Sequence, residues 1–301
     1  MKKIRSRRHV DDIRRGTAGA LTVVATYLAG KGVNLPQAFI PNTYPAGALN
    51  PCPLCPAGFV YYTTGASSIQ NAGQFEVRRR LMSGLQWTAT YTLTKATDNA
   101  SSFNGFGGAT AQNWLDLEAE RSTSSFEQRH LFRYNVTYNT GQGLGGGALR
   151  TGLKGKLLNG WSTSWNVTAG SGTSRSPIYR VTSVAGITGT VRAKLTGEPI
   201  DGGPDGYYAN PDAFAPPDPG TWGNAPRNSI RGPGQFTVGA SASRSFQFAN
   251  RYGLNWNINV TNVFNRVTYS SIDSTVGSPQ FGLPLTVNQM RRITTRMNLS
   301  F

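Results

Sequence analysis

Apolar and polar residues alternate along several stretches of the chain, as they do in β-strands with one nonpolar face. In 84–97, Trp87 and Tyr91 fall on one face with other apolar residues, while threonines fall on the opposite face. The same period of two predicts eight strands in all: 19–30, 67–81, 84–97, 127–140, 157–170, 235–248, 252–265 and 289–301. Each reaches about ten residues or more, the length with which a tilted strand crosses a bilayer.

The links between the predicted strands alternate in length. Tight or moderate links occupy 82–83, 141–156 and 249–251. The other links are long: 31–66, 98–126, 171–234 and 266–288. Outer-membrane barrels have short periplasmic turns and long extracellular loops. The pattern therefore predicts an all-β fold, a partial antiparallel up-and-down transmembrane β-barrel of about eight strands, with Phe301 at its periplasmic rim.

The two faces of the strands differ in chemistry. The polar face is rich in Thr, Ser, Asn and Gln, which suits a wet lumen better than a soluble surface. Arg78 and Arg80 belong to this face, whereas Arg79 belongs to the apolar one. Aromatic residues on the apolar face predict a membrane girdle of Trp87, Tyr91, Tyr138, Trp161, Trp165 and Trp256. A soluble sandwich or barrel also alternates and is the alternative fold.

Composition supports a membrane-facing surface without proving it. Charged residues make up 15% of the chain, against about 25% in soluble domains. Lys and Arg total 30 and Asp and Glu 14, giving a net charge of +16. A basic balance suits nucleic acid and anionic lipid equally well. No segment has the 18 or more apolar residues of a membrane helix, so a helical membrane protein is excluded.

The first 30 residues place an apolar stretch after a basic one, as a secretory signal does. Asp11 and Asp12 interrupt the basic region, and the apolar stretch alternates from Leu21 to Ala29. A strand is therefore the favoured interpretation, and it predicts that the export signal is not within 1–301.

Four stretches carry a family resemblance: 65–101, 113–132, 224–236 and 255–301, with weaker similarity in 23–36. They resemble the carboxy-terminal barrel of TonB-dependent receptors, particularly the Oar-like branch. Full-length members carry a carboxypeptidase-regulatory-like domain, a plug and a TonB box, which 1–301 lacks. Since such barrels have 22 strands, the resemblance implies that 1–301 is one domain, roughly the last third of the barrel.

The resemblance implies a location in the outer membrane of a Gram-negative-type bacterium. The partners it implies are membrane lipid and lipopolysaccharide, TonB through the plug, and the barrel assembly machinery, for which the ring of Phe301 is the signal. Nucleic acid is not an expected partner. The function it implies is energy-coupled uptake of a scarce ligand. A passive porin-like or adhesin-like barrel is the alternative, and a soluble basic nucleic-acid binder is the alternative from another class.

Two clusters of residues raise the question of metal or redox chemistry. Cys52 and Cys55 could form a redox pair, a haem anchor or half a zinc site, but no His follows and no further ligands lie nearby. A local disulfide is favoured. Asp201 and Asp205 could bind Ca²⁺, although an ordinary Gly/Pro/Asp turn is favoured. We expect no metal or cofactor.

The segment 113–122 carries closely spaced charges. Either they form a loop ion-pair cluster that folds 97–127, or they contact ligand, and the first is favoured. The expected members of this cluster are Asp116, Glu118, Glu120, Arg121 and Arg129. The only histidines are His9 and His130, and no triad is recognisable. No catalytic residue is therefore expected.

Overall fold

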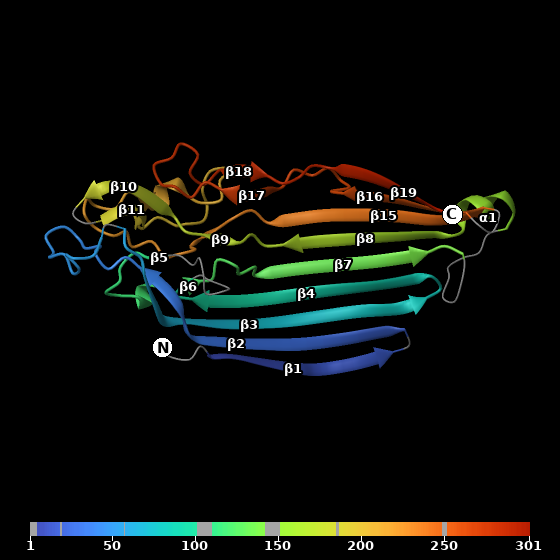
Figure 1. The fold of residues 1–301 in the computed structure, drawn as a ribbon, viewed down its shortest axis with the longest axis horizontal. Helices are drawn as coiled ribbons and strands as arrows, with labels where there is room; N and C mark the ends of the chain where they lie inside the picture. The colour runs from blue at the N-terminus through green and yellow to red at the C-terminus, as the bar shows by residue number, and fades with distance from the viewer. Residues whose placement is uncertain are drawn as a thin grey trace.

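The structure of the chain is a computed structural model, drawn in Figure 1. The residues that it describes are 5–18, 20–56, 58–100, 110–141, 151–184, 187–248 and 252–301.

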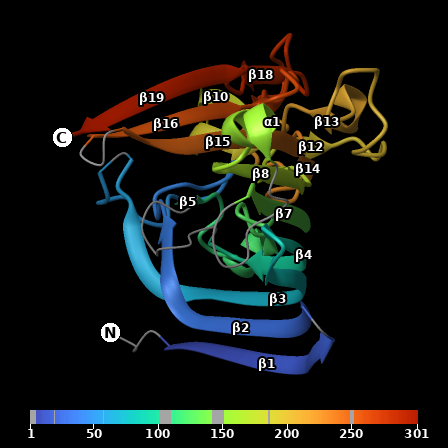
Figure 2. The ribbon, with the colours of Figure 1, turned by 90° about the vertical axis from the view of Figure 1, so that its right-hand side faces the viewer.

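Long antiparallel strands form one sheet in the described part of the chain, and nine of them follow one another in sequence order. They are β1 (Arg5–Ala18), β2 (Leu21–Phe39), β3 (Tyr61–Met82), β4 (Leu85–Asp98), β7 (His130–Asn139), β8 (Trp161–Gly170), β15 (Gln235–Phe248), β16 (Tyr252–Thr261) and β19 (Arg292–Ser300). Two short strands, β5 (Thr110–Ala111) and β6 (Ser122–Thr123), pair with β2 and β4. The sheet curves into an open arc with β1 and β19 at its edges (Figure 2).

The prediction of an antiparallel all-β barrel fold is confirmed, but the expected number of long strands was too low by one. The missing strand is β1, which pairs with β2 along its whole length. Its sequence, RSRRHVDDIRRGTA, contains few apolar residues and has no alternation to detect. β2 and β3 also extend further toward the long loops than expected, whereas the N-terminal part of 157–170 belongs to a helix, α1 (Gly152–Leu158).

The strand register keeps apolar residues together on one face. Trp87 lies opposite Val136, and Val136 lies opposite Trp165 on the next strand. Because directly paired residues point to the same side of a sheet, this face is continuous across neighbouring strands. On the other face, polar residues line up in the same way, as Asn135 does with Asn166.

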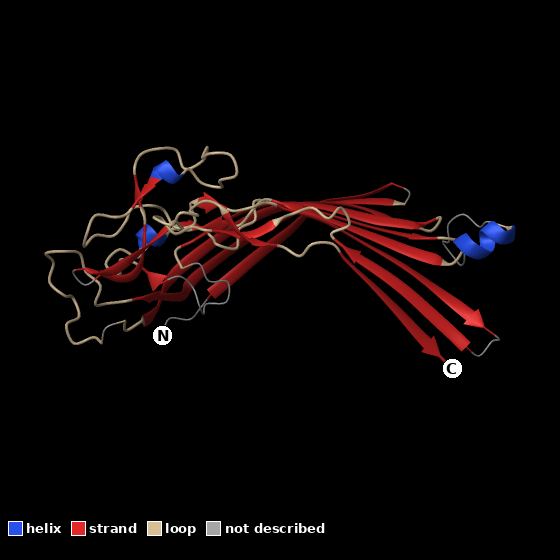
Figure 3. Cartoon of the chain, turned by 90° about the horizontal axis from the view of Figure 1, so that it is seen from above, coloured by secondary structure: helices blue, strands red, loops and turns tan. Residues whose placement is uncertain are grey.

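The connections sort by length to the two ends of the sheet. β3 and β4 are joined by Ser83 and Gly84, both with positive φ (52° and 77°), as in a tight two-residue hairpin turn. This short-turn end also holds α1 and the C-terminus, while the long loops gather at the opposite end (Figure 1). Within the described ranges, helical segments lie only at the two ends of the molecule (Figure 3). No helix in the described residues is long and apolar enough to span a membrane.

The long loops fold into a small structure of their own. Their strands are β9 (Ser174–Arg175), β10 (Ile178–Val184), β11 (Ile187–Arg192), β12 (Lys194–Leu195), β13 (Phe214–Ala215), β14 (Ile230–Arg231), β17 (Tyr269–Ile272) and β18 (Pro284–Val287). Two 3-10 turns, Glu118–Glu120 and Pro211–Ala213, complete them. Their buried apolar cluster is Ala193, Ala209, Ala213, Phe214, Ala225, Ile230, Ile272, Val276 and Phe281. This apolar core thus lies among the loops, at one end of the sheet.

Candidate ligand-facing surface

The polar face of the sheet is built mainly from short uncharged side chains, with a few charged ones such as Glu76, Arg78 and Arg133. On β2 the side chains of this face are less exposed than those of the apolar face. Thr22, on the polar face, is 1% exposed, whereas its neighbour Leu21, on the apolar face, is 41% exposed. The amide of Asn166 lies over Gly239 on the adjacent strand, where a Cβ would come within 2.2 Å of its Oδ1. Glycine at this position lets the Asn166 amide lie flat against the sheet.

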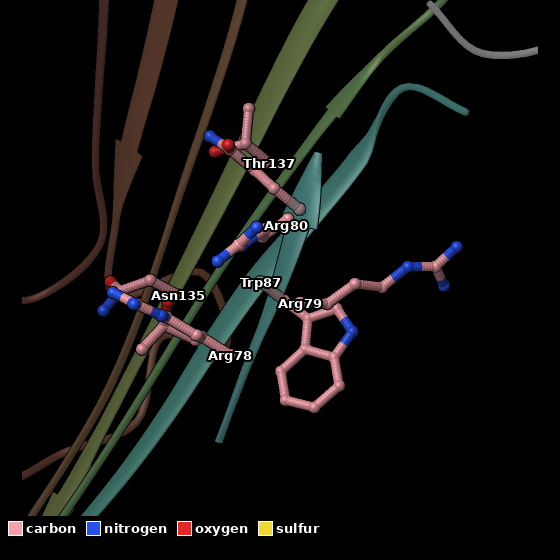
Figure 4. A pocket seen from close by; sticks show the side chains of 8 residues that line it. Arg78, Arg79, Arg80, Trp87, Asn135 and Thr137 are labelled. Carbon is pink, nitrogen blue, oxygen red and sulfur yellow. The ribbon is translucent and has the colours of Figure 1, made fainter. Parts of the chain in front are cut away.

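A hollow of about 440 Å³ lies near the short-turn end of the sheet. Arg78, Arg80, Asn135 and Thr137 project to one side of the strands, and Arg79 projects to the other side with Trp87 (Figure 4). The buried Nε of Arg78 has no hydrogen-bond partner among the described residues. The polar face therefore carries positive charge at this end, where an anionic group would find hydrogen-bond donors.

At the loop end, Arg227 and Asp98 form a buried ion pair that joins two loops distant in sequence. One guanidinium nitrogen of Arg227 lies 2.7 Å from the carboxylate of Asp98 and also donates to the Asp98 carbonyl. Its Nε donates to the carbonyl of Glu120 at 3.0 Å. Arg192 in turn places a guanidinium nitrogen 2.6 Å from the Glu120 carboxylate. These contacts tie the connection 171–234 to the connection that follows β4.

The five residues expected in a loop ion-pair cluster are distributed over separate contacts. Glu120 joins the buried network just described, whereas Glu118 pairs with Arg121 at the surface. Asp116 accepts a hydrogen bond from the backbone N–H of Ala119 at 3.1 Å. Arg129 lies 3.7 Å from Glu127. Each contact lies within the loops or between them.

The surface pair of Glu118 and Arg121 shifts the pKa values of both side chains. The hydrogen bond from Arg121 lowers the pKa of the Glu118 carboxyl from its ordinary value of 4.5, while burial acts in the opposite direction. The carboxylate in turn raises the pKa of Arg121. Arg121 also donates to the hydroxyl of Ser67 at 2.7 Å, which connects the pair to β3.

Three of the partners in the buried network, Asp98, Arg192 and Arg227, were not expected from the sequence. Arg227 lies within 224–236, a stretch that was noted for its resemblance and not for its charge. Asp98 directly follows the predicted strand 84–97 and accepts a local hydrogen bond from the backbone N–H of Ala100 at 3.0 Å. Since Asp98 and Arg227 are 129 positions apart, the resemblance of 224–236 was the available signal for this network.

The β2–β3 loop contains the two cysteines. A disulfide joins Cys52 to Cys55, and no free cysteine is present among the described residues. Asn42 donates its amide to the carbonyl of Pro56 at 3.1 Å, closing the loop around the disulfide. Asp201 and Asp205 are exposed. No group of three or more His, Cys, Asp or Glu in the described ranges is placed to hold a metal ion.

The aromatic residues expected in a girdle lie on the apolar face, but not at one level. Trp161 and Trp256 have ring centroids 5.8 Å apart near the short-turn end. Trp165 lies four positions farther along β8. Trp87 lies on β4 close to the short turn, with its ring 6.0 Å from that of Tyr134.

The remaining two members lie at opposite ends of the same strand pair. Tyr138 lies opposite Leu85 beside the short turn. Tyr91 lies well toward the loops, where its hydroxyl is 2.7 Å from Nδ1 of His130. The set therefore extends over much of the strand length, with four of its members, Trp87, Tyr138, Trp161 and Trp256, near the short turns.

The ring of Phe301 lies at the short-turn end. It meets Tyr252 edge to face, with ring centroids 6.4 Å apart. Phe301 itself is 83% exposed and directly follows the edge strand β19. Its apolar surface is therefore available at the rim.

Comparison with protein families matches residues 12–294 to the outer membrane beta barrel domain. The chain belongs to this family. Its location in the outer membrane follows, and the prediction of that location is confirmed. The apolar face of the sheet is accordingly the face that contacts lipid, and the polar face is the lumenal one.

Two solved structures provide further comparisons. The outer membrane transporter YddB from Escherichia coli is similar with a TM-score of 0.54 and 9% identity, over 95% of this chain and 31% of YddB. FpvA of P. aeruginosa, solved bound to heterologous pyoverdines, gives a TM-score of 0.44 and 13% identity, over 94% of this chain and 25% of FpvA. No curated protein sequence matched the chain. The chain thus spans about a third of YddB, with which it shares a fold.

Proposed function

We propose that this chain forms the carboxy-terminal part of the barrel of a TonB-dependent receptor, of the Oar-like type, that imports a scarce ligand. The observation that carries the proposal is the open arc with a polar inner face and folded loops at one end. A sheet with two unpaired edges exposes backbone N–H and C=O groups that a bilayer cannot satisfy. Additional strands between β19 and β1 would close it into a wide barrel.

The folded loops suit ligand capture better than passive flow. Buried ion pairs and the apolar cluster hold the connection 171–234 in one arrangement above the end of the sheet. A preorganised loop surface loses less conformational entropy when a ligand binds. Transport energy would come from TonB through a plug inside the barrel, and the sequence resemblance of 65–101, 113–132 and 224–236 supports this type of receptor.

The other proposed partners follow from the same arrangement. Lipopolysaccharide would contact the outer face at the loop end, because this end faces outward when the short turns are periplasmic. The barrel assembly machinery would bind the chain during insertion, with Phe301 as its signal. No catalytic residue is assigned in this proposal.

The decisive experiment reads the gene upstream of residue 1 and then tests passive flow. We expect the reading frame to encode a plug and a TonB-interacting segment before this barrel segment. The full-length protein should then fail to conduct small sugars into liposomes, since a plug fills the lumen. An export signal placed directly before residue 1, together with rapid liposome swelling, would support the porin-like alternative instead.

A further inference from the structure

The short helix α1, at the short-turn end, exposes more apolar surface than a helix in water should. Leu153 is 80% exposed, Leu157 is 69% exposed and Leu158 is 49% exposed. Leu153 and Leu157 are four residues apart and therefore share one side of the helix. Exposed apolar residues gathered in this way are typical of a contact with a membrane or with another protein.

The helix is fixed in place by two side chains of neighbouring strands. Trp161 donates its indole N–H to the carbonyl of Leu157 at 3.0 Å. Arg244 donates to the same carbonyl at 2.7 Å and to the carbonyl of Lys156. The last carbonyls of a helix need such donors, and a cation there also interacts favourably with the helix dipole. α1 is therefore held at its C-terminal end.

Both of these side chains belong to the lipid-facing surface of the sheet. Trp161 and Arg244 are directly paired across β8 and β15, and Trp256 pairs with Arg244 on the next strand. The guanidinium carbon of Arg244 lies 4.6 Å from the ring centroid of Phe246. In Figure 2, α1 lies beside β8 and β15 on the convex side of the arc. The exposed leucines thus continue the surface that contacts lipid.

The charge around α1 has a single sign. The helix carries Lys154 and Lys156, both exposed, and the whole connection 140–160 contains no Asp or Glu. Long basic side chains can place their charge at headgroup level while their methylene groups remain in the apolar region. Leucines flanked by lysines on a helix at the edge of a bilayer are the composition of an interfacial anchor.

We infer that α1 is a membrane-interface anchor that inserts Leu153, Leu157 and Leu158 into the periplasmic leaflet. Lys154, Lys156 and Arg244 then contact the phosphates of anionic phospholipid. The anchor fixes the depth of β7 and β8 in the bilayer from the short-turn end. This inference rests on membership of the outer-membrane barrel family and is independent of TonB coupling.

The test measures membrane depth at α1 in the full-length protein reconstituted into vesicles. Leu157→Cys is labelled with a fluorophore that is sensitive to its environment, in vesicles of phosphatidylcholine containing phosphatidylglycerol with brominated acyl chains. A matched control is Leu115→Cys, at a residue 68% exposed in the connection that follows β4 at the other end of the sheet. We expect the bromines to quench about half of the fluorescence at position 157, since an interfacial helix lies about 5–10 Å into the bilayer, and none at position 115.

The role of charge is tested by a second variant. Lys154→Gln together with Lys156→Gln, added to Leu157→Cys, should reduce the quenching in anionic vesicles more than in neutral ones. Iodide in the aqueous phase should reach the label at position 115 but not at position 157. If the label at position 157 is open to iodide and unaffected by brominated lipid, the inference is wrong. Protection from iodide without quenching by lipid would also overturn it and would indicate a protein contact.

Discussion

Arg227 and Asp98 form an ion pair at 2.7 Å with side chains that are only 4% and 5% exposed. The pair joins the loop before β15 to the end of β4, so two connections that are far apart in sequence are locked together. Its burial at the loop end means that its effect on stability can be measured without disturbing the lipid-facing strands.

Replacing Arg227 by Ala should lower the free energy of unfolding by about 3–5 kcal/mol, because the buried Asp98 carboxylate loses its cation. The measurement is urea unfolding of the full-length protein in lipid vesicles. The matched control is Lys194→Ala, which removes an exposed pair with Asp218 whose side chains are 46% and 67% exposed. The Lys194→Ala substitution should lower the free energy of unfolding by at most about 1 kcal/mol. Equal effects of the two substitutions would show that the buried pair does not hold the loops.

The pair of Glu118 and Arg121 should make stability depend weakly on pH. Because folding lowers the pKa of Glu118 below 4.5, its contribution is complete above 4.5 and disappears as the pH falls through the folded-state pKa. Glu118→Gln should lower the free energy of unfolding near neutral pH by less than about 1 kcal/mol, since the Glu118 side chain is 64% exposed. The difference in the free energy of unfolding between Glu118→Gln and the wild type should shrink below pH 4.5. A difference that stays constant over the whole acidic range would contradict this assignment.

The assignment of the two faces can be tested with adjacent residues of β3. Phe75 is 50% exposed and lies opposite Ala25 and Tyr91 on the apolar face, whereas Gln74 belongs to the polar face. Phe75→Arg should destabilise the inserted protein by about 2–4 kcal/mol, because an arginine near the bilayer midplane faces lipid. Gln74→Arg should change stability by less than about 1 kcal/mol. Urea unfolding in vesicles measures both changes in stability. If Gln74→Arg destabilises the protein more than Phe75→Arg does, the lipid-facing and lumenal faces have been assigned the wrong way round.

Phe301 should affect insertion more than stability. Assembly by strand addition would use the backbone of the edge strand β19 for affinity and the terminal ring for register. Phe301→Ser in the full-length protein should slow insertion into the outer membrane in cells. Insertion is measured by pulse-chase labelling and protease protection. The unfolding midpoint of protein that is already inserted should barely change, because the ring is 83% exposed and its described ring contact is with Tyr252. Insertion at the normal rate, with stability lost, would make the ring an anchor and not a signal.

The strands could be predicted from the sequence where one face is apolar. The β15 segment 235–248 was predicted with the observed bounds, and β4 within one residue, because the pattern of Trp87 to Leu93 has a period of two. β1 could not be found in this way, since basic and acidic residues occupy both of its faces.

The loop structure could not be predicted from local pattern. The charges of 113–122 indicated an ion-pair cluster, but the partners Arg192 and Arg227 come from another loop, 72 and 107 positions from Glu120. α1 was also missed, because GLKGKLL is short and contains two glycines, and its stability comes from Arg244 and Trp161 on the strands. Contacts between distant segments determine these parts of the fold.

The position of the apolar core among the loops has a consequence for how the sequence can change over evolutionary time. A smaller side chain at Leu299, on the lipid face, leaves no void, because fluid acyl chains move into the space. A smaller side chain at Ile230, which is completely buried, leaves a cavity that the packed neighbours cannot fill. The side chains of the membrane-spanning surface can therefore vary freely in volume as long as they stay apolar. Loops are usually the most variable part of a protein, but in this chain the buried loop residues are the ones whose size and shape are more tightly restricted.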